Sequence, residues 1–430
     1  MRTTIHTRPT RRRRIAGIAA AAAAVALVLA GCSTPSSTTS PSASSGKASG
    51  KVTIWVGSWW QPNIDAIQTA WKKAHPEITL DFEPLPIANY ADKFTSAALG
   101  GTPPDIIDLD VSMLSSIAAK NLLQPMADFV KSEKIDQAAY ASAVWQASSF
   151  KGTQYGIPDH AYSSFLYYNK ALFDQAGLAY PTSSWDYDEF LADAQKLSTG
   201  GNSGFGMAAD LSDPANAMDF IGQCIWGHGG DFFNKNGTKA TINSKQAIAG
   251  LTYWADLYTK YHVVPSGTPN FTVTRDVVPL FEAGKVAMVS QGAQLMVEFA
   301  QHPDLNYGMV TLPDKVNRGG GWTMGIPVGA KNPDAAKVFL KWFSDPTRQG
   351  SLMPTTPALI KANAVSPWNK PQFDVSTEAF AHSRSLPQVA NWAAMQTAIV
   401  TELQKVLVGQ ETVKQAADSL EQQLTSLLTS

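Results

Sequence analysis

Cysteine is nearly absent from this sequence: 430 residues contain only two, Cys32 and Cys224. So few thiols exclude a scaffold stapled by disulfides and a cysteine-rich metal site. We expect Cys224 to behave as a small buried apolar residue, which is the usual environment of a free cysteine.

The motifs of several enzyme classes are also absent. The seven histidines are scattered, without an HExxH motif, and there is no GxSxG or Walker sequence. His228 and Asp231 flank two glycines, but two candidate ligands do not predict a metal site. We therefore expect no metal, no cofactor and no enzymatic activity. A secreted glycoside hydrolase stays open, because its two carboxylates leave no linear signature; Asp110 and Glu83 would be the candidates.

Long apolar runs are absent except near the N-terminus. Six arginines and no acidic residue lie within residues 1–14, and an alanine-rich apolar stretch follows at 15–29. This order, with small residues before a cleavage point, is typical of a secretory signal peptide, and a spanning helix would need about 20 predominantly apolar residues. We predict that residues 1–31 are removed. The four consecutive arginines leave both the general and the twin-arginine export routes open.

The segment after this stretch predicts a tether. Leu29-Ala30-Gly31-Cys32 resembles the bacterial lipobox, which implies that Cys32 carries the lipid, palmitate included, and anchors the protein at the extracellular face of the membrane. Residues 33–50 contain only Ser, Thr, Pro, Ala, Gly and one Lys. Such a segment has no apolar surface to bury, so we predict a disordered tether over 32–50.

Positive charge is scarce in the mature chain. Without residues 1–31, 28 basic residues face 35 acidic ones, a net charge of −7. This balance argues against nucleic acid as a partner and against a membrane contact other than the lipid anchor.

The remaining residues alternate between strand and helix patterns. Residues 52–56 and 105–109 are short β-branched or aliphatic runs, 78–82 alternate in polarity, and 64–74 carry apolar residues at helical spacing. The pattern predicts an α/β fold, and a body of this length predicts two lobes. Residues from Trp392 onward are expected to be helical.

Several stretches, in order, resemble the family 1 extracellular solute-binding proteins, the maltose-binding-like group. The stretches are VTIWVGSWW at 52–60, AWKKAHPEITLDFEPLP at 70–86, LGGTPPDIIDLD at 99–110, GTQYGIPDHAYSSFLYYNKALFDQAGL at 152–178, IWGHGGDFF at 225–233, FEAGKVAMVSQGAQ at 281–294 and GGWTMGIPVGAKNPDAAKVFLKWFSDP at 320–346.

The resemblance implies a type II periplasmic-binding-protein fold with two α/β lobes joined by hinge strands. Lobe one would comprise 51–160 and 312–355, and lobe two 161–311 and 356–430. It also implies a monomer that captures a carbohydrate, an oligosaccharide or disaccharide, and delivers it to the permease subunits of an ABC importer. A non-sugar polar solute remains an alternative.

Candidate ligand contacts begin at the carboxyl ends of the first strands, where open α/β sheets bind ligands. Trp59 and Trp60 could each offer an apolar face to a sugar ring. Because successive side chains alternate, they cannot both point inward. Asp110 could accept from two sugar hydroxyls or cap the helix after it. Glu83 is either a ligand contact or a solvated surface residue.

Two further candidates lie at the expected lobe crossing. The resemblance implies a sugar-binding carboxylate six residues before Tyr168 in the motif ending LYYNK, but Tyr162 stands there. A tyrosine favours stacking over hydroxyl pairing. His160 is the neighbouring candidate.

The last candidates follow glycines or open a helix. Trp226 precedes GHGGD and Trp322 follows three glycines, which allow a close approach of the backbone to a ligand. The resemblance implies that Trp322 and Trp392 are aromatic platforms, although Trp392 could equally lie in the core.

An amide replaces one aromatic platform of the family. Where relatives read GPW after the strand at 286–289, this chain reads GAQ at 292–294. Gln291 and Gln294 can each donate and accept a hydrogen bond, so we expect a different sugar orientation or a smaller ligand.

Overall fold

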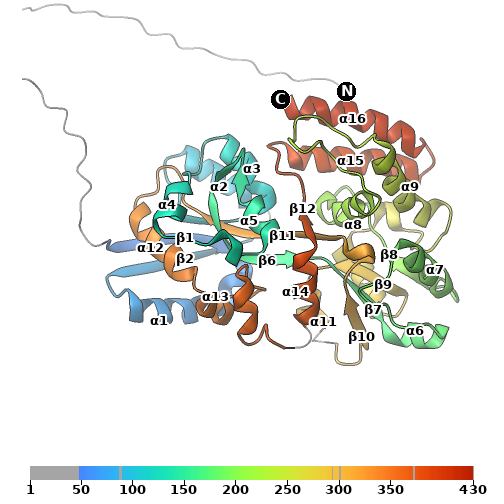
Figure 1. Ribbon diagram of the computed structural model, residues 1–430, viewed down its shortest axis with the longest axis horizontal. Coiled ribbons are helices and arrows are strands. Elements are labelled where there is room, and N and C mark those ends of the chain that lie inside the picture. The colour runs from blue at the N-terminus through green and yellow to red at the C-terminus, as the bar shows by residue number, and fades with distance from the viewer. Residues whose placement is uncertain (1–47, 87–89, 293, 300–301, 371–372, 430) are drawn as a thin grey trace, which may run out of the picture. The chain divides into compact units, whose positions relative to one another are not determined.

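Two β-sheets organise the protein (Figure 1). The computed structural model describes residues 48–86, 90–292, 294–299, 302–370 and 373–429. Ala48–Ser430 form one compact unit. The predicted signal peptide, Cys32 and most of the predicted tether lie outside the described residues. The first strand begins at Gly50, the last residue of the expected tether.

The larger sheet has the strand order β12-β11-β3-β1-β2, and β6 also pairs with β11. β1 runs parallel to β2 and β3, whereas β11 runs antiparallel to β3 and β6. The strands expected near 52–56, 78–82 and 105–109 are confirmed as β1, β2 and β3. The six strands are β1 (Gly50–Gly57), β2 (Ile78–Leu85), β3 (Ile106–Asp110), β6 (Gly156–Ser163), β11 (Asn317–Gly325) and β12 (Ser383–Ser385).

Helices cover this sheet, and the longer ones bury an apolar face against it. In α1, Ile64, Ile67 and Trp71 lie on the buried face, and the indole N–H of Trp71 donates to the carbonyl of Ile78, 2.8 Å away. We call this sheet and its helices the first lobe. The helices are α1 (Ile64–Ala74), α2 (Tyr90–Leu99), α3 (Val111–Ala119), α4 (Ala127–Ser132), α5 (Ser142–Ala147), α12 (Pro333–Phe343) and α13 (Pro346–Leu352).

A second sheet, in the order β10-β7-β9-β8, organises the second lobe. Its strands are β7 (Phe165–Asn169), β8 (Ser203–Gly206), β9 (Val286–Gln291) and β10 (Tyr307–Val310). Its helices are α6 (Lys170–Ala176), α7 (Tyr187–Leu197), α8 (Pro214–Gly227), α9 (Lys245–Thr259), α10 (Val278–Glu282), α11 (Gln294–Phe299), α15 (Trp392–Leu407) and α16 (Val413–Thr429). The helical end expected from Trp392 onward is confirmed.

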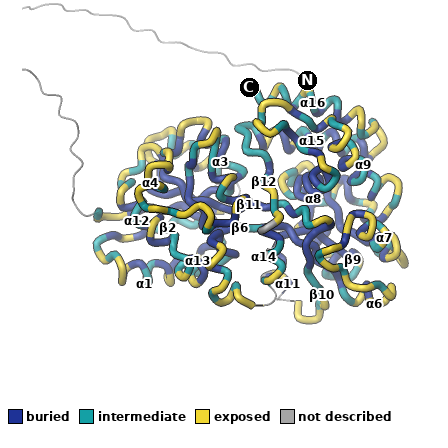
Figure 2. The backbone as a smooth tube through the Cα atoms, viewed as in Figure 1, coloured by how far each residue is buried: buried dark blue, intermediate teal, exposed yellow. Residues whose placement is uncertain are grey.

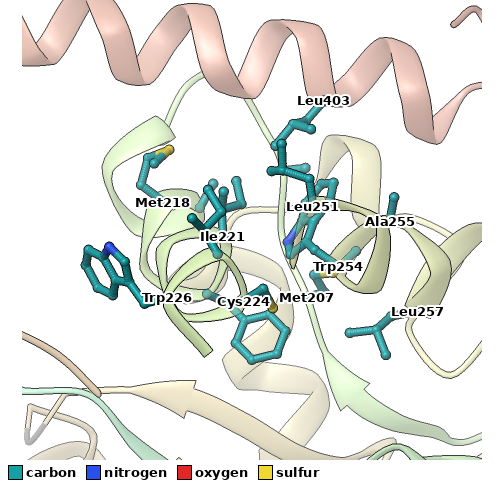
Figure 3. Close-up of a cluster of buried hydrophobic side chains, with 14 of the residues drawn as sticks. Met207, Met218, Ile221, Cys224, Trp226, Leu251, Trp254, Ala255, Leu257 and Leu403 are labelled. Carbon is teal, nitrogen blue, oxygen red and sulfur yellow. The ribbon is translucent and has the colours of Figure 1, made fainter. Parts of the chain in front are cut away.

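The core of the second lobe lies between α8, α9 and α15. Figure 3 shows Ile221 and Cys224 of α8 beside Leu251 and Trp254 of α9, with Leu403 reaching in from α15. Cys224 is fully buried, as expected. In Figure 2 the strands of both sheets are mostly buried, and exposed residues collect on the outer helices and loops.

The chain passes between the lobes at Ser164, between β6 and β7, and again between β10 and β11. A third crossing runs through α14 (Asp374–Ala381) and β12. The expected end of lobe one at 355 differs from the packing. Ala358, Leu359 and Ala362 belong to the first-lobe core, because β-bridges join Leu359 to Tyr140 and Pro357 to His160.

No helix among the described residues is both long and apolar enough to span a membrane.

Candidate ligand-binding site

A cavity of about 380 Å³ is lined by residues of both lobes. We call it the interlobe cavity. Its volume falls within the range of small-molecule sites. The first lobe contributes Asp110, Ser112, Met113, Tyr162, Arg318 and Trp322, and the second contributes Ala215, Asn216, Asp219, Gln291, Gly292 and Gln396.

Trp322 forms one wall of this cavity from the middle of β11. Its backbone pairs with Asp110 of β3 on one side and His160 of β6 on the other. Its ring stacks on His160, with centroids 5.9 Å apart, and meets Trp59 edge-on at 4.4 Å. Only 7% of Trp322 is exposed. The tryptophan is therefore held rigidly before any ligand arrives.

Asp110 caps a helix, as one of its two expected roles requires, and it also lines the cavity. Its Oδ1 accepts from the backbone N–H of Ser112 at 2.8 Å, which caps α3. The residue also lines the cavity and stays partly exposed. A capping carboxylate is fixed in orientation, so it can present its other oxygen to a ligand without further ordering.

Arg318 and Asp219 form an ion pair between the lobes inside the cavity wall. Nη1 of Arg318 lies 3.0 Å from Oδ1 of Asp219, and the two side chains are 13% and 7% exposed. The guanidinium lies over the ring of Tyr162, 4.7 Å from its centroid. Burial raises the pKa of Asp219 to about 6, although Arg318 opposes the shift. The carboxylate is therefore ionised at neutral pH.

Sequence reasoning missed this pair. Arg318 directly precedes the three glycines before Trp322, and Asp219 is the only acid in the otherwise buried stretch from Ala217 to Trp226 of α8. A lone acid on a buried helix face indicates a partner or a ligand, because an unpaired buried charge is costly. The sequence therefore indicated that Asp219 has a partner, but not that the partner is Arg318.

Asp108, Asp159 and His160 form a buried cluster behind Trp322. Among the described residues, these are the only ones that bring three potential metal-ligating atoms within 4.8 Å of one another. Oδ2 of Asp159 bonds Nδ1 of His160 at 2.8 Å, and Oδ2 of Asp108 accepts from the indole N–H of Trp60 at 3.0 Å. The other oxygen of each aspartate is buried, without a hydrogen-bond partner among the described residues. Burial raises the pKa of Asp159 to about 8 and lowers that of His160 to about 4. A proton shared between the two carboxyl groups would give both oxygens a partner.

Comparison with known proteins gives this architecture a family. The model of the bacterial extracellular solute-binding proteins matches residues 56–350, which include the whole second sheet, most strands of the larger sheet and most of the cavity wall. The chain belongs to this family. The expected two-lobed α/β fold is confirmed, and the family is defined by solute binding rather than by catalysis.

Individual relatives are distant. A putative binding protein of Brucella abortus is 27% identical over 257 residues, which cover 59% of this chain and 60% of that protein. The chain thus matches less than two thirds of that relative's length. A maltooligosaccharide ABC transporter solute-binding lipoprotein of Streptococcus pneumoniae is 24% identical over 410 residues, covering 91% of this chain and 92% of the relative. The solved structure of the sugar-binding protein MalE of Xanthomonas citri superposes with a TM-score of 0.78 over 88% of this chain and 98% of that one, at 19% identity. The last likeness concerns the fold alone.

Three tryptophans that the sequence suggested as ligand platforms lie in the cores of this solute-binding protein. Trp60 is completely buried in the first lobe, where Asp108 accepts its N–H. Trp226 is 5% exposed in the second-lobe core (Figure 3), with the guanidinium of Arg384 over its ring. Trp392 is 1% exposed and packs edge-on against Phe232. These side chains have no free face for a ligand, so the three predictions are wrong.

Two candidates contact the cavity wall without lining the cavity themselves. Trp59 is half-buried in the 3-10 helix η1 (Ser58–Asn63) and contacts Trp322 and His160, but it does not line the cavity. His160 is 5% exposed and supports Trp322 from behind.

Glu83 is a surface residue of β2. It pairs with Lys93 at 2.8 Å, and about half of each side chain is exposed. It does not line the interlobe cavity, and the solvated alternative describes it better.

The remaining candidates line the cavity, except for one whose side chain lies outside the described part of the structure. Asp110, Tyr162, Gln291 and Trp322 line it. Gln291 ends β9, and its Oε1 accepts from the N–H of Gly292 at 2.8 Å. Gln294 begins α11, and its side chain lies outside the described part of the structure.

Proposed function

We propose that this protein captures a carbohydrate in the interlobe cavity and delivers it, unaltered, to the permease of a bacterial ABC importer. The observation that carries the proposal is the make-up of the cavity wall. Two aromatic side chains, Trp322 and Tyr162, stand beside amides and carboxylates drawn from both lobes. A sugar ring combines an apolar C–H face with hydroxyl groups that donate and accept, so it needs both kinds of surface.

The division of the wall between the lobes supports a role in transport. A ligand that contacts both lobes favours the arrangement in which they are close together, by as much as its contacts differ between the two states. Hinge closure of this kind is the usual motion of periplasmic-type binding proteins. The closed form is the state that a permease would recognise.

The proposal includes a lipid anchor on Cys32 at the outer face of the membrane. The pneumococcal relative bears the name of a lipoprotein, and the lipobox-like residues precede Cys32. In a bacterial host, the wild-type chain should incorporate labelled palmitate and sediment with membranes, whereas Cys32→Ser should do neither. Cys224→Ser is the matched control, because it removes the other thiol and should stay anchored. Labelled, membrane-bound Cys32→Ser would contradict the anchor.

Thermal unfolding of the chain from Ser33 to Ser430 against a panel of mono-, di- and oligosaccharides tests the capture of sugar. A ligand at one hundred times its dissociation constant adds about 2.7 kcal/mol to the stability and raises the midpoint visibly. Recovery of the intact ligand separates binding from hydrolysis. A panel without any shift would contradict sugar capture and favour a non-sugar polar solute, and recovery of cleaved product would contradict simple binding.

A further inference from the structure

Arg384 contacts the same kinds of side chain as Arg318, an aromatic ring and an aspartate. The two arginines are register neighbours on the parallel strands β11 and β12. Each guanidinium lies over an aromatic ring, Arg318 over Tyr162 at 4.7 Å and Arg384 over Trp226 at 5.0 Å. Each also pairs with an aspartate of the second lobe, Arg384 with Asp231 at 2.6 Å.

The two pairs differ in their surroundings. Arg384 and Asp231 keep 47% and 43% of their side chains exposed and do not line the interlobe cavity. Arg318 and Asp219 are almost wholly buried and do line it. A buried ion pair brings little net stability compared with apolar packing, because both charges lose their hydration. A role in ligand contact gives a reason for a charged pair at this position.

The donors of Arg318 are not all satisfied. Its Nε–H is buried, and no described residue offers it an acceptor. A buried donor without an acceptor is costly, so this donor adds to the cost of keeping Arg318 at this position.

The ring of Tyr162 packs against the guanidinium of Arg318 and holds it in place. It does so by lying over Gly320, where an added Cβ would come within 2.7 Å of the tyrosine oxygen. The glycine before the cavity thus permits the arrangement.

The charges around the cavity favour one class of solute. Three of the residues that line it carry a charge: Arg318, Asp219 and Asp110. One cation and two carboxylates leave a net negative wall. A carboxylate or phosphate on a ligand would meet that wall unfavourably, whereas neutral hydroxyls can donate to the aspartates and accept from Arg318.

We propose that Arg318 and Asp219 are the polar specificity determinants of the site, contacting the hydroxyls of an uncharged sugar and rejecting its acidic counterparts. The inference rests on the proposed function and adds to it the residues that select the ligand and the charge class of that ligand.

The test is a set of binding titrations with matched neutral and acidic probes: glucose with glucuronate, galactose with galacturonate, and maltose. The variants are Arg318→Gln and Asp219→Asn, and Arg384→Gln serves as the matched control outside the cavity. The wild type should bind a neutral probe at least tenfold more tightly than its acidic partner. Arg318→Gln should weaken that binding at least tenfold, Asp219→Asn should narrow the discrimination against the acid, and Arg384→Gln should change affinity less than twofold.

Arg318→Gln leaves Asp219 buried without a cation, so it could unfold. The double variant Arg318→Gln/Asp219→Asn removes both charges and should show the same tenfold loss in a folded protein, as checked by its thermal transition. A folded single or double variant with wild-type affinity would overturn the inference and leave sugar capture intact. Tighter binding of an acidic probe would overturn the selectivity alone. If the wild type binds neither kind of sugar, the proposed function fails, and the inference fails with it.

Discussion

His160 and Trp322 stack on neighbouring strands, with ring planes 14° apart and centroids 5.9 Å apart. Trp59 closes the stack edge-on, and Tyr90 meets Trp322 from another side at 6.0 Å. The aromatic wall of the cavity is thus continuous with the first-lobe core. Its contribution to binding and its contribution to stability cannot be separated by truncating Trp322.

Trp322→Ala should destabilise the fold as well as weaken binding. The side chain is 7% exposed, and truncation of a buried tryptophan costs about 3–5 kcal/mol. Denaturant unfolding measures this loss. Trp322→Phe keeps a ring against His160 and Trp59, so it should lose clearly less stability than Trp322→Ala. An alanine variant as stable as the wild type would contradict the packing described for this residue.

Gly320→Ala and Gly321→Ala should distinguish an effect on ligand binding from an effect on the stability of the sheet. A Cβ at Gly320 would press on the Tyr162 ring, 2.7 Å from its oxygen, so the tyrosine must move away from Arg318. A Cβ at Gly321 would lie 2.2 Å from the carbonyl oxygen of His160, which is backbone and cannot yield easily. Gly321→Ala should therefore lower the midpoint of thermal unfolding more than Gly320→Ala does. Gly320→Ala should weaken sugar binding several-fold, measured by titration. The reverse order of stability would contradict this geometry.

The Asp159–His160 pair should make stability fall with pH just above neutrality. Between about pH 4 and 6.5 the two groups oppose each other: unfolded His160 binds a proton that the native state lacks, and native Asp159 keeps one that the unfolded state releases. From about 6.5 to 8 His160 no longer differs between the two states, and the buried carboxyl groups remain: Asp159, and Asp108, whose pKa burial also raises well above its usual range. The pKa of Asp159, raised by burial to about 8 from 3.8, means that the native state binds more protons, so stability declines as pH rises.

Asp159→Asn removes the contribution of Asp159 to this dependence, leaves that of Asp108, and can still accept from Nδ1 of His160. We expect the wild type to lose about 1–2 kcal/mol relative to the variant between pH 6.5 and 8, measured by urea unfolding at both values. Curves that stay parallel over this interval would show that Asp159 is ionised throughout.

Much of the fold was predictable because burial follows local patterns. Ile64, Ile67 and Trp71 recur at helical spacing, and the buried Ile78 and Leu80 are separated by the exposed Thr79. Each pattern describes a face that one element buries by itself. Such patterns are visible in a single sequence.

The site was predictable only where a residue continues one of these patterns. Asp110 and Trp322 follow recognisable strands or glycines, and both line the cavity. Trp226 and Trp392 look the same in sequence, but the guanidinium of Arg384 lies over Trp226 and Phe232 packs against Trp392. Arg318 and Asp219 belong to different lobes, and only the packing of the lobes brings them within 3.0 Å. No local spacing encodes that approach.

The same substitution should cost much more stability at Trp60 than at its neighbour Trp59. The indole N–H of Trp60 donates to Asp108 at 3.0 Å, so Trp60→Phe leaves a fully buried carboxyl group without its donor. We expect a loss of about 1–3 kcal/mol in denaturant unfolding for that reason alone. The indole N–H of Trp59 is buried and has no acceptor in the described part of the chain, so Trp59→Phe removes an unsatisfied group and should cost less than about 1 kcal/mol. Each variant serves as the control for the other, because both replace indole by phenyl in the same short helix. Equal losses would show that ring volume, rather than the pairing of the N–H, determines the stability at both positions.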